Sequence, residues 1–257
     1  MKIIKKLNNE KNTILIYKKK NKYYVDKIFN PKNLVFYKKE VLGLKYFIKK
    51  KYFEIPKLYY YKIKNNSGII TQEYINGKKA SIFDIKTIFK KISLANNKSS
   101  IKNYIIKLNK NYCHKKKYLP KKLKNNYFLQ KKKIFVSKTH GDFVNYNCLR
   151  KGKKSYILDF EKFRERIAVY DYLNWIFHPL SYNISKYFFS SRKIFIFKFL
   201  NISIVFVFNY LIKVFARKIF YKLKINIKDF DIYYYLYLYE KILIIKNDLA
   251  YVKNKKL

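Results

Sequence analysis

Two short stretches in the second half of the chain contain residues suited to moving a phosphoryl group. One is His140-Gly141-Asp142, with Asn147 five positions after the aspartate, and the other is Asp159-Phe160-Glu161. Phosphoryl transfer needs one carboxylate to orient the attacking hydroxyl. It also needs a second carboxylate and an amide that hold metal ions against the phosphates. The first hypothesis is therefore that Asp142, Asn147 and Asp159 form one site.

The segment between these stretches favours a hairpin that would bring them together. Arg150 to Lys154 contains a glycine and is typical of a turn, with Asn147 to Leu149 before it and Tyr156 to Leu158 after it. In an antiparallel pair, facing residues lie about 5 Å apart. Asn147, which enters one strand, and Asp159, which leaves the other, are thus predicted to share Mg²⁺, which prefers oxygen ligands.

The same residues resemble known kinase motifs. His140-Gly141-Asp142, four further residues and Asn147 match the spacing of the protein-kinase catalytic loop, and Asp159-Phe160-Glu161 stands where its D-F-G tripeptide would be. The chain is most similar here to the aminoglycoside phosphotransferase and choline kinase superfamily, above all to its bacterial, glycan-associated branches. The resemblance implies Asp142 as catalytic base, a scaffolding role for His140 in the catalytic loop, and Asn147 and Asp159 as magnesium ligands.

The first part of the chain has the pattern of a small sheet with one helix. Short β-rich runs are separated by asparagine- and lysine-rich turns, and a helical stripe follows a proline-containing break. The predicted strands are Ile3 to Leu7, Thr13 to Tyr17, Tyr23 to Phe29, Lys57 to Lys62 and Gly68 to Tyr74, and the predicted helix is Leu34 to Lys49.

This sheet is expected to supply the site for ATP. Lys27 lies on the third predicted strand, where the strand lysine of the superfamily holds the α- and β-phosphates, and Glu40 on the following helix would pair with it. Glu73 and Ile75 resemble the hinge whose backbone binds adenine. One feature departs from the family: the loop Asn8 to Asn12 lacks the glycines that let backbone amides approach phosphates. Without these glycines, the loop would cover the phosphates of ATP less closely, or the chain would be an inactive pseudokinase.

These patterns predict an α+β, two-lobed protein-kinase-like fold. Residues 1–76 would form a small antiparallel-sheet N-lobe, and residues 77–257 a mainly helical C-lobe that holds the catalytic loop and the metal-binding hairpin. From Ser81 onward the pattern is helical except for one β segment, Asn147 to Phe160. No long activation segment follows Asp159, which favours a small-molecule or glycan acceptor over a protein substrate.

The positive charge is extreme but diffuse. The formal net charge is +45, from 60 Lys and Arg against 15 Asp and Glu. Such a charge can attract polyanions or anionic lipid. However, AT-rich codons favour Lys, Asn, Ile, Tyr and Phe, and the lysines are scattered in short runs typical of solvated surfaces. Nucleic acid is therefore disfavoured as a partner, an anionic membrane surface stays an alternative, and no obligate protein partner is predicted.

The location expected for the chain is the cytoplasm, with peripheral association at the inner face of the membrane as the alternative. Its two cysteines, Cys113 and Cys148, have no disulfide or zinc spacing. The most apolar segment, Ile194 to Phe215, is interrupted by lysines and asparagines and is predicted to be a buried helix rather than a membrane span.

Two functional hypotheses follow. The first is an ATP-dependent phosphotransferase that acts on a hydroxyl group of a small molecule or a cell-surface sugar or glycan. The alternative is a catalytically weak or inactive kinase-like module that binds an anionic partner through its basic surface. Magnesium-dependent consumption of ATP would separate the two.

Overall fold

The computed structural model describes residues 2–9, 12–50, 54–81, 97–112, 126–177, 216–217 and 219–254. Its contacts divide the chain into two compact units, one formed by residues 1–93 and 138–164, the other by residues 94–137 and 165–257. This grouping differs from the predicted division after residue 76, because residues 138–164 make most of their contacts with the N-terminal segment. The lobe boundary itself stays a prediction.

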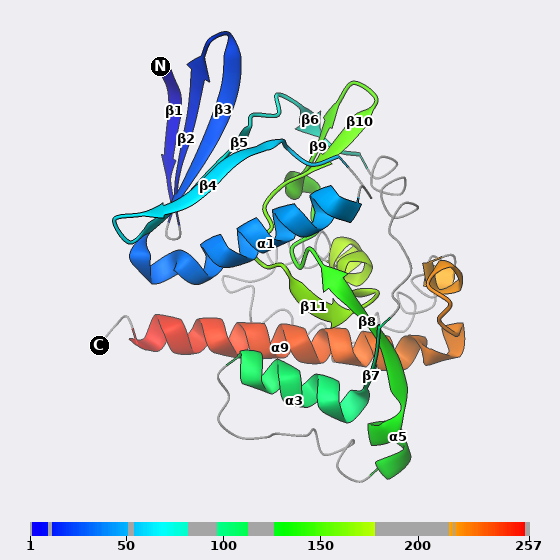
Figure 1. Ribbon diagram of the computed structural model, residues 1–257. Helices are drawn as coiled ribbons and strands as arrows, with labels where there is room; N and C mark the ends of the chain where they lie inside the picture. Colours follow the sequence, from blue (N-terminus) through cyan, green and yellow to red (C-terminus); the bar gives the residue numbers. More distant parts are fainter. Residues whose placement is uncertain are drawn as a thin grey trace, which may run out of the picture. The chain divides into compact units, whose positions relative to one another are not determined.

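The first unit is built on a five-stranded antiparallel sheet with the strand order β1-β2-β3-β5-β4 (Figure 1). All five predicted strands are present to within two residues at each end. They are β1 (Lys2–Asn8), β2 (Asn12–Lys19), β3 (Lys22–Phe29), β4 (Leu58–Lys64) and β5 (Ser67–Glu73).

Asparagine takes the place of glycine at the tight turns of this sheet. The β2–β3 turn places Lys20 and Asn21 at φ values of 45° and 58°, and the β4–β5 turn places Asn65 and Asn66 at 47° and 57°. Two consecutive residues with positive φ form the hairpin turn that matches the twist of the strands, and asparagine tolerates this conformation better than most residues. A chain with only 5 glycines can therefore still form these hairpins.

Helix α1 (Leu34–Lys50), introduced by the short helix η1 (Pro31–Asn33), packs on the sheet as predicted. Its buried face is apolar apart from Glu40, and it includes Leu44 and Phe47. The ring of Tyr37 meets that of Phe29 from β3 at 6.0 Å. Because a lone carboxylate in an apolar stripe is costly, Glu40 needs a partner across the interface.

The predicted hairpin is also present. Strands β9 (Cys148–Lys151) and β10 (Lys154–Ile157) pair in antiparallel register, and the short strand β6 (Lys78–Lys79) adds to β9. The linker before β6 runs close against the hairpin, since a Cβ atom at Gly77 would lie 2.7 Å from the carbonyl oxygen of Arg150. Glycine is required there for close approach.

The prediction of a mainly helical chain after Ser81 with one β segment was wrong in detail. Three further strands form a sheet with the order β11-β8-β7: β7 (Asn97–Ser100), β8 (Lys133–Thr139) and β11 (Arg164–Ile167). Strand β8 has the period-two burial of a half-buried strand, with Ile134 and Val136 inside. In the sequence, however, Ile134, Phe135 and Val136 are three consecutive apolar residues, so this alternation does not show there.

Helices dominate the rest of the described part of the second unit. They are α3 (Ile101–Asn111), α5 (Tyr127–Lys131), η3 (Ile227–Asp229) and the long α9 (Phe230–Asn254). Helices α3 and α9 run side by side (Figure 1), and the hydroxyl of Tyr239 on α9 donates a 2.9 Å hydrogen bond to Asn109 on α3. Aromatic rings such as Phe220, Phe230 and Tyr233 fill the core beside them.

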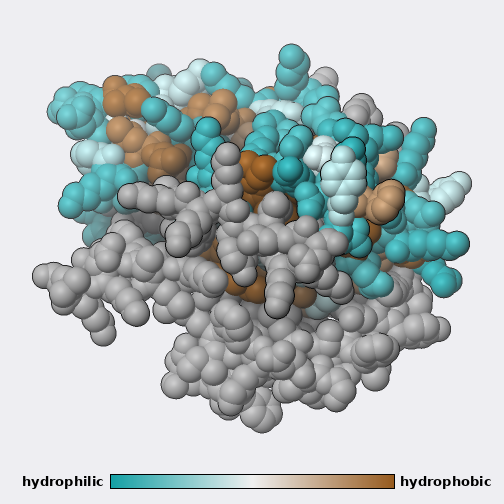
Figure 2. All heavy atoms as spheres, turned by 90° about the horizontal axis from the view of Figure 1, so that it is seen from below, coloured by the Kyte–Doolittle hydropathy of each residue, from teal (hydrophilic) through white to brown (hydrophobic). Residues whose placement is uncertain are grey.

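Hydrophilic side chains dominate the coloured surface in Figure 2, with hydrophobic atoms in smaller patches. This agrees with a chain in which charged residues make up 29%. Among the helices that the structure describes, none is long and apolar enough to cross a membrane. The predicted buried helix at Ile194 to Phe215 lies outside the described residues.

Candidate active site

All the predicted site residues belong to the first unit, and the loop with His140 and Asp142 begins where β8 ends. His140 is fully buried. Its Nδ1 accepts a 3.1 Å hydrogen bond from the backbone N–H of Asp142, so its Nε2 is the nitrogen that donates to the carbonyl of Leu158 at 2.8 Å. His140 thus fastens the loop to the end of β10 and acts as a positioning residue.

Asn147 is buried and lies at the start of the hairpin, in the one-turn helix η2 (Asn145–Asn147). Its side-chain N–H donates a 2.9 Å hydrogen bond to the carbonyl of Asp142. Its own carbonyl accepts from the backbone N–H of Leu158 at 2.9 Å, which places it beside the residue before Asp159. With the amide nitrogen used in this way, the amide oxygen is the atom suited to a cation.

Asp159 follows β10 with a left-handed backbone, φ 65°. Non-glycine residues take this conformation at a cost, and such strain is found most often where the fold must aim a functional side chain. One carboxylate oxygen lies 3.5 Å from the ammonium of Lys27, and the side chain is 36% exposed. Asp159 therefore faces both the buried lysine and the solvent side.

The predicted ion pair between Lys27 and Glu40 is present. The ammonium of Lys27 on β3 lies 2.8 Å from Oε1 of Glu40 on α1, and both residues are buried. Burial alone would lower the pKa of Lys27, but the charges of Asp159 and Glu40 outweigh it and raise that pKa. The lysine is held as a fixed cation.

Negative charge exceeds positive charge around this lysine. Burial raises the pKa of Glu40, Lys27 opposes that shift, and the charges of Asp159 and Glu161 reinforce it. Oε2 of Glu40 is buried without a hydrogen-bond partner. An excess of negative charge is an environment that a divalent cation would balance.

The oxygen donors available suit magnesium. Among the described residues, no three His, Cys, Asp or Glu side chains are grouped to hold a metal ion. A cation here would therefore rely on the amide oxygen of Asn147 together with the carboxylate of Asp159, which is the donor set that magnesium accepts alongside water and phosphate oxygens.

Helix α1 fixes the segment that carries Asp159. A Cβ atom at Gly43 would lie 2.6 Å from the Cβ of Phe160, so the helix backbone presses directly on this residue. The ring of Phe47 packs against those of Phe160 and Phe163 at 5.3 Å and 5.8 Å. Because Glu40 and Gly43 share one face of the helix, the same element sets the positions of Lys27 and Asp159.

Two contacts at the site were not foreseen from the sequence. The ammonium of Lys162 lies 3.0 Å from Oδ2 of Asp142, and the side-chain N–H of Asn12 donates a 2.7 Å hydrogen bond to Oε1 of Glu161. Arg166, five residues after Glu161, pairs with Glu240 at 2.8 Å. Asn12 and Glu161 are 149 positions apart in the chain, and sequence spacing does not predict a contact over such a separation.

The predicted hinge residues lie at the end of β5. Glu73 faces Tyr24 across the β3–β5 pair, while Lys27 faces Ile70 three residues further along. That offset is roughly 10 Å along the sheet. Ile75 is buried in the linker that follows. Binding of adenine there stays a prediction.

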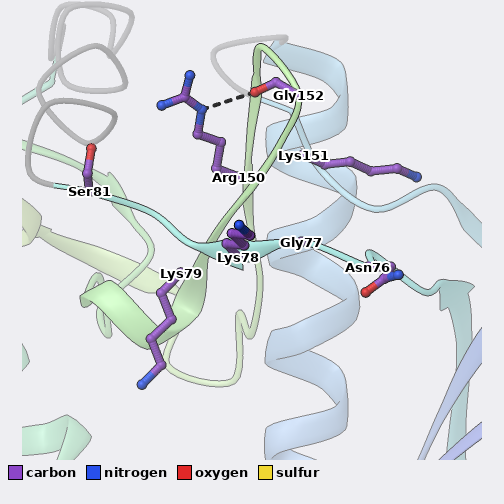
Figure 3. A pocket seen from close by; sticks show the side chains of 8 residues that line it. All are labelled: Asn76, Gly77, Lys78, Lys79, Ser81, Arg150, Lys151 and Gly152. Atoms are coloured by element: carbon purple, nitrogen blue, oxygen red, sulfur yellow. Dashed lines mark hydrogen bonds between the residues drawn. The ribbon is translucent and has the colours of Figure 1, made fainter.

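A separate hollow lies between the linker and the hairpin turn, lined by Lys78, Lys79, Arg150 and Lys151 among others (Figure 3). Arg150 is turned back on its own turn, where its Nε donates to the carbonyl of Gly152 at 3.0 Å. In Figure 3 the side chains of Lys79 and Lys151 point in different directions. The hollow is cationic, but its charges do not converge on one point.

Comparison with solved structures identifies the fold of the chain. A thermostable mutant of the aminoglycoside phosphotransferase APH(4)-Ia, in ternary complex with AMP-PNP and hygromycin B, matches 96% of this chain and 84% of its own at a TM-score of 0.52 and 12% identity. The chain has the kinase-like fold of that phosphotransferase. This confirms the predicted α+β, two-lobed class, whereas an identity this low leaves substrate and activity to be proposed.

Two other structures match more loosely. Amicoumacin kinase hAmiN, in complex with AMP-PNP, Ca²⁺ and Ami, matches 70% of this chain at a TM-score of 0.43 and 12% identity, and the match spans just under two thirds of that kinase, 65%. A choline/ethanolamine kinase family protein from Mesorhizobium loti matches 66% of this chain and 62% of its own at 0.39 and 13%. No protein-family model and no curated protein matches the chain.

Proposed function

We propose that this chain is an ATP-dependent phosphotransferase of the aminoglycoside phosphotransferase and choline kinase superfamily, with an alcohol group as acceptor. The observation that carries the proposal is the joining of the two motifs by His140, which binds the backbone of Asp142 on one side and of Leu158 on the other. His140 thereby holds the proposed catalytic loop next to the end of β10, where the proposed metal ligand Asp159 lies.

Asp142 is the proposed catalytic base. The acceptor oxygen attacks the γ-phosphorus of ATP, the bond between that phosphorus and the β–γ bridging oxygen breaks, ADP leaves, and the hydroxyl proton passes to Asp142. Lys162, 3.0 Å from the carboxylate, orients it and adds positive charge near the incoming phosphates. Asp142 is assigned the proton chemistry from its place in the His140-Gly141-Asp142 motif, and Asp159 is assigned to the metal.

Asn147 and Asp159 are the proposed magnesium ligands. When bound, magnesium neutralises charge on the phosphates that would otherwise repel the attacking oxygen. Lys27, fixed by Glu40, binds the α- and β-phosphates. Glu73 and Ile75 present their backbone to adenine, at a distance along the sheet that suits the length of a nucleotide.

The acceptor is proposed to be a hydroxyl on a small molecule or on a cell-surface sugar or glycan. The matched phosphotransferase is in complex with hygromycin B, and one of the looser matches is an amicoumacin kinase. A location in the cytoplasm, with contact to an anionic membrane surface through the scattered lysines, is part of the same proposal.

The test is a phosphate-transfer assay with γ-labelled ATP, Mg²⁺ and a panel of hydroxyl acceptors that includes hygromycin B, choline and hexoses. The wild-type chain is expected to consume ATP only with Mg²⁺ present, and Asp142→Ala to abolish turnover while ATP binding is retained. Unchanged transfer by Asp142→Ala would refute the role of Asp142. Absence of any ATP binding by the wild-type chain would favour the inactive, anion-binding module instead.

A further inference from the structure

A buried hydrogen bond links the loop between β1 and β2 to the segment that carries Asp159. The side chain of Asn12 donates to the carboxylate of Glu161 at 2.7 Å, and the two residues are only 2% and 7% exposed. Glu161 comes two residues after Asp159. An amide-to-carboxylate hydrogen bond out of water is among the stronger contacts a protein makes, and breaking one partner leaves a buried charge without its donor.

The register of the sheet places Asn12 on the side where the proposed nucleotide site lies. Lys27 on β3 faces Ile14 on β2, and Asn12 is two residues from Ile14. Side chains two apart along a strand project to the same face. Asn12 and Lys27 therefore share a face of the sheet, and the groups that each contacts, Glu161 and Asp159, are neighbours in the chain.

The loop itself is closed by asparagines. Oδ1 of Asn9 accepts a 2.7 Å hydrogen bond from the backbone N–H of Asn12, and Nδ2 of Asn9 donates to Oδ1 of Asn12 at 2.8 Å. The backbone N–H of Asn9 also donates to the carbonyl of Asn12 at 3.0 Å. The amide oxygen of Asn12 thus accepts a hydrogen bond within the turn, and its amide nitrogen donates one to Glu161. One side chain therefore links the turn to the segment after Asp159.

We propose that Asn12 and Glu161 are positioning residues that fasten the nucleotide loop to the metal-binding segment, in place of a glycine-rich loop. The inference rests on the proposed function and adds to it the means by which a loop without glycine covers the phosphates. A glycine-rich loop adapts to the phosphates when they arrive, whereas here Asn12, at the end of the loop, is held in place beforehand. ATP then binds without the entropic cost of ordering this residue.

The first test is a titration of ATP with Mg²⁺ against Asn12→Ala, with the Kd and the KM for ATP measured beside kcat. Loss of the anchor is expected to weaken ATP binding about tenfold or more, the size typical for a hydrogen bond to a charged group. The value of kcat at saturating ATP should fall by less than about threefold, because Asp142 and Asn147 keep their own contacts. A purely structural role would not separate KM from kcat in this way.

A reversed pair provides the rescue. Asn12→Asp alone places two carboxylates against each other and should weaken ATP binding at least as much as Asn12→Ala. In the double variant Asn12→Asp with Glu161→Gln, the donor and acceptor exchange sides while the total charge is kept, and ATP binding should return to within about threefold of wild type. Failure of the double variant to improve on Asn12→Asp would overturn the inference.

Thr13→Val is the matched control. Its hydroxyl donates to Asn8 at 3.1 Å on the same loop, but the contact is exposed. ATP binding should change by less than about twofold. An effect as large as that of Asn12→Ala would mean that any disturbance of the loop matters, and would remove the special role of Asn12.

Hydrogen exchange of the full chain separates this inference from the proposed function, because it needs no nucleotide. The backbone N–H of Asn12 should exchange at least about tenfold faster in Glu161→Ala than in wild type, since the turn loses its anchor. If exchange accelerates while the wild-type chain binds no ATP, the anchor stands and the proposed function fails. If the wild-type chain transfers phosphate and both exchange and ATP binding are unchanged in the variants, the inference fails alone.

Discussion

The two units each contain a fully buried glutamate paired with a basic side chain at 2.8 Å. The two glutamates differ in the hydrogen bonds that their remaining carboxylate oxygens make. In the second unit, Glu240 binds Nε of Arg166 and accepts from the hydroxyls of Tyr104 and Tyr112 at 3.1 Å and 3.2 Å. Both carboxylate oxygens are satisfied. In the first unit, Glu40 binds Lys27 through one oxygen, and the other has no hydrogen-bond partner.

This is the difference we expect between a structural cluster and the proposed ligand site. A buried ion pair whose hydrogen bonds are all made holds helices together, as Glu240 does between α9 and Tyr104 on α3. The Lys27 pair instead lies among surplus carboxylates and next to a half-open aspartate, an arrangement that costs stability in the free protein. Functional sites are where such costs are tolerated.

Removing one charge from each pair should reduce stability by very different amounts, and this is the largest expected effect on stability. Glu240→Gln leaves Arg166 buried without its counter-charge and should lower the free energy of unfolding by about 3 kcal/mol or more. Glu40→Gln removes a charge that burial already disfavours, so the loss should stay within about 1 kcal/mol. Chemical denaturation of both variants measures the two values.

Activity should show the reverse order. Glu40→Gln frees the Lys27 ammonium and should raise the KM for ATP about tenfold, whereas properly folded Glu240→Gln should bind ATP normally at low temperature. Equal destabilisation by the two substitutions would mean that both pairs are structural. The proposed difference between the two pairs would then be wrong.

A smaller effect is expected from Lys162, which contacts the proposed base at 3.0 Å. Lys162→Met should lower kcat about tenfold, because Asp142 loses the group that orients it, while ATP affinity changes little. Lys154→Met is the control. Lys154, on β10, is also partly exposed and also pairs with a carboxylate, that of Glu54, at 3.4 Å. A lower kcat for both variants would point to general surface charge rather than to Lys162.

The smallest effect concerns Gly43 on α1. In an exposed helix, alanine in place of glycine would stabilise by about 1 kcal/mol. Here the new methyl group would meet the Cβ of Phe160 at 2.6 Å, so the crowding should reverse the sign and cost about 1 to 2 kcal/mol. Thermal unfolding of Gly43→Ala checks this. A stabilised variant would show that α1 does not press on the segment of Asp159.

The strands of the first unit could be predicted because local signals agree there. Short runs of β-branched and apolar residues mark β2 and β5, and asparagines mark the turns between strands. Strand β8 was not predicted, because its apolar run from Ile134 to Val136 is short and lysines surround it. The two-residue β6 exists only through its pairing with β9, and nothing in Lys78 and Lys79 predicts a strand.

For the site, motif spacing located Asp142, Asn147 and Asp159, and strand position located Lys27 with Glu40. The contacts that tune these groups depend on tertiary structure. Asn12 meets Glu161 only after the sheet and the segment 159–163 have packed together, and Lys162 reaches Asp142 only through the turn after Asp159. In a chain with 60 basic residues, no composition signal singles out one lysine.

The division of labour between the two aspartates is tested most directly by calorimetric titration of ATP with and without Mg²⁺. Asparagine is the substitution of choice at position 159, because it tolerates the left-handed backbone there. We predict that Asp142→Asn binds ATP with the magnesium dependence of the wild type but transfers no phosphate, and that Asp159→Asn loses the magnesium dependence. Wild-type, magnesium-dependent binding by Asp159→Asn would contradict the assignment of the metal site.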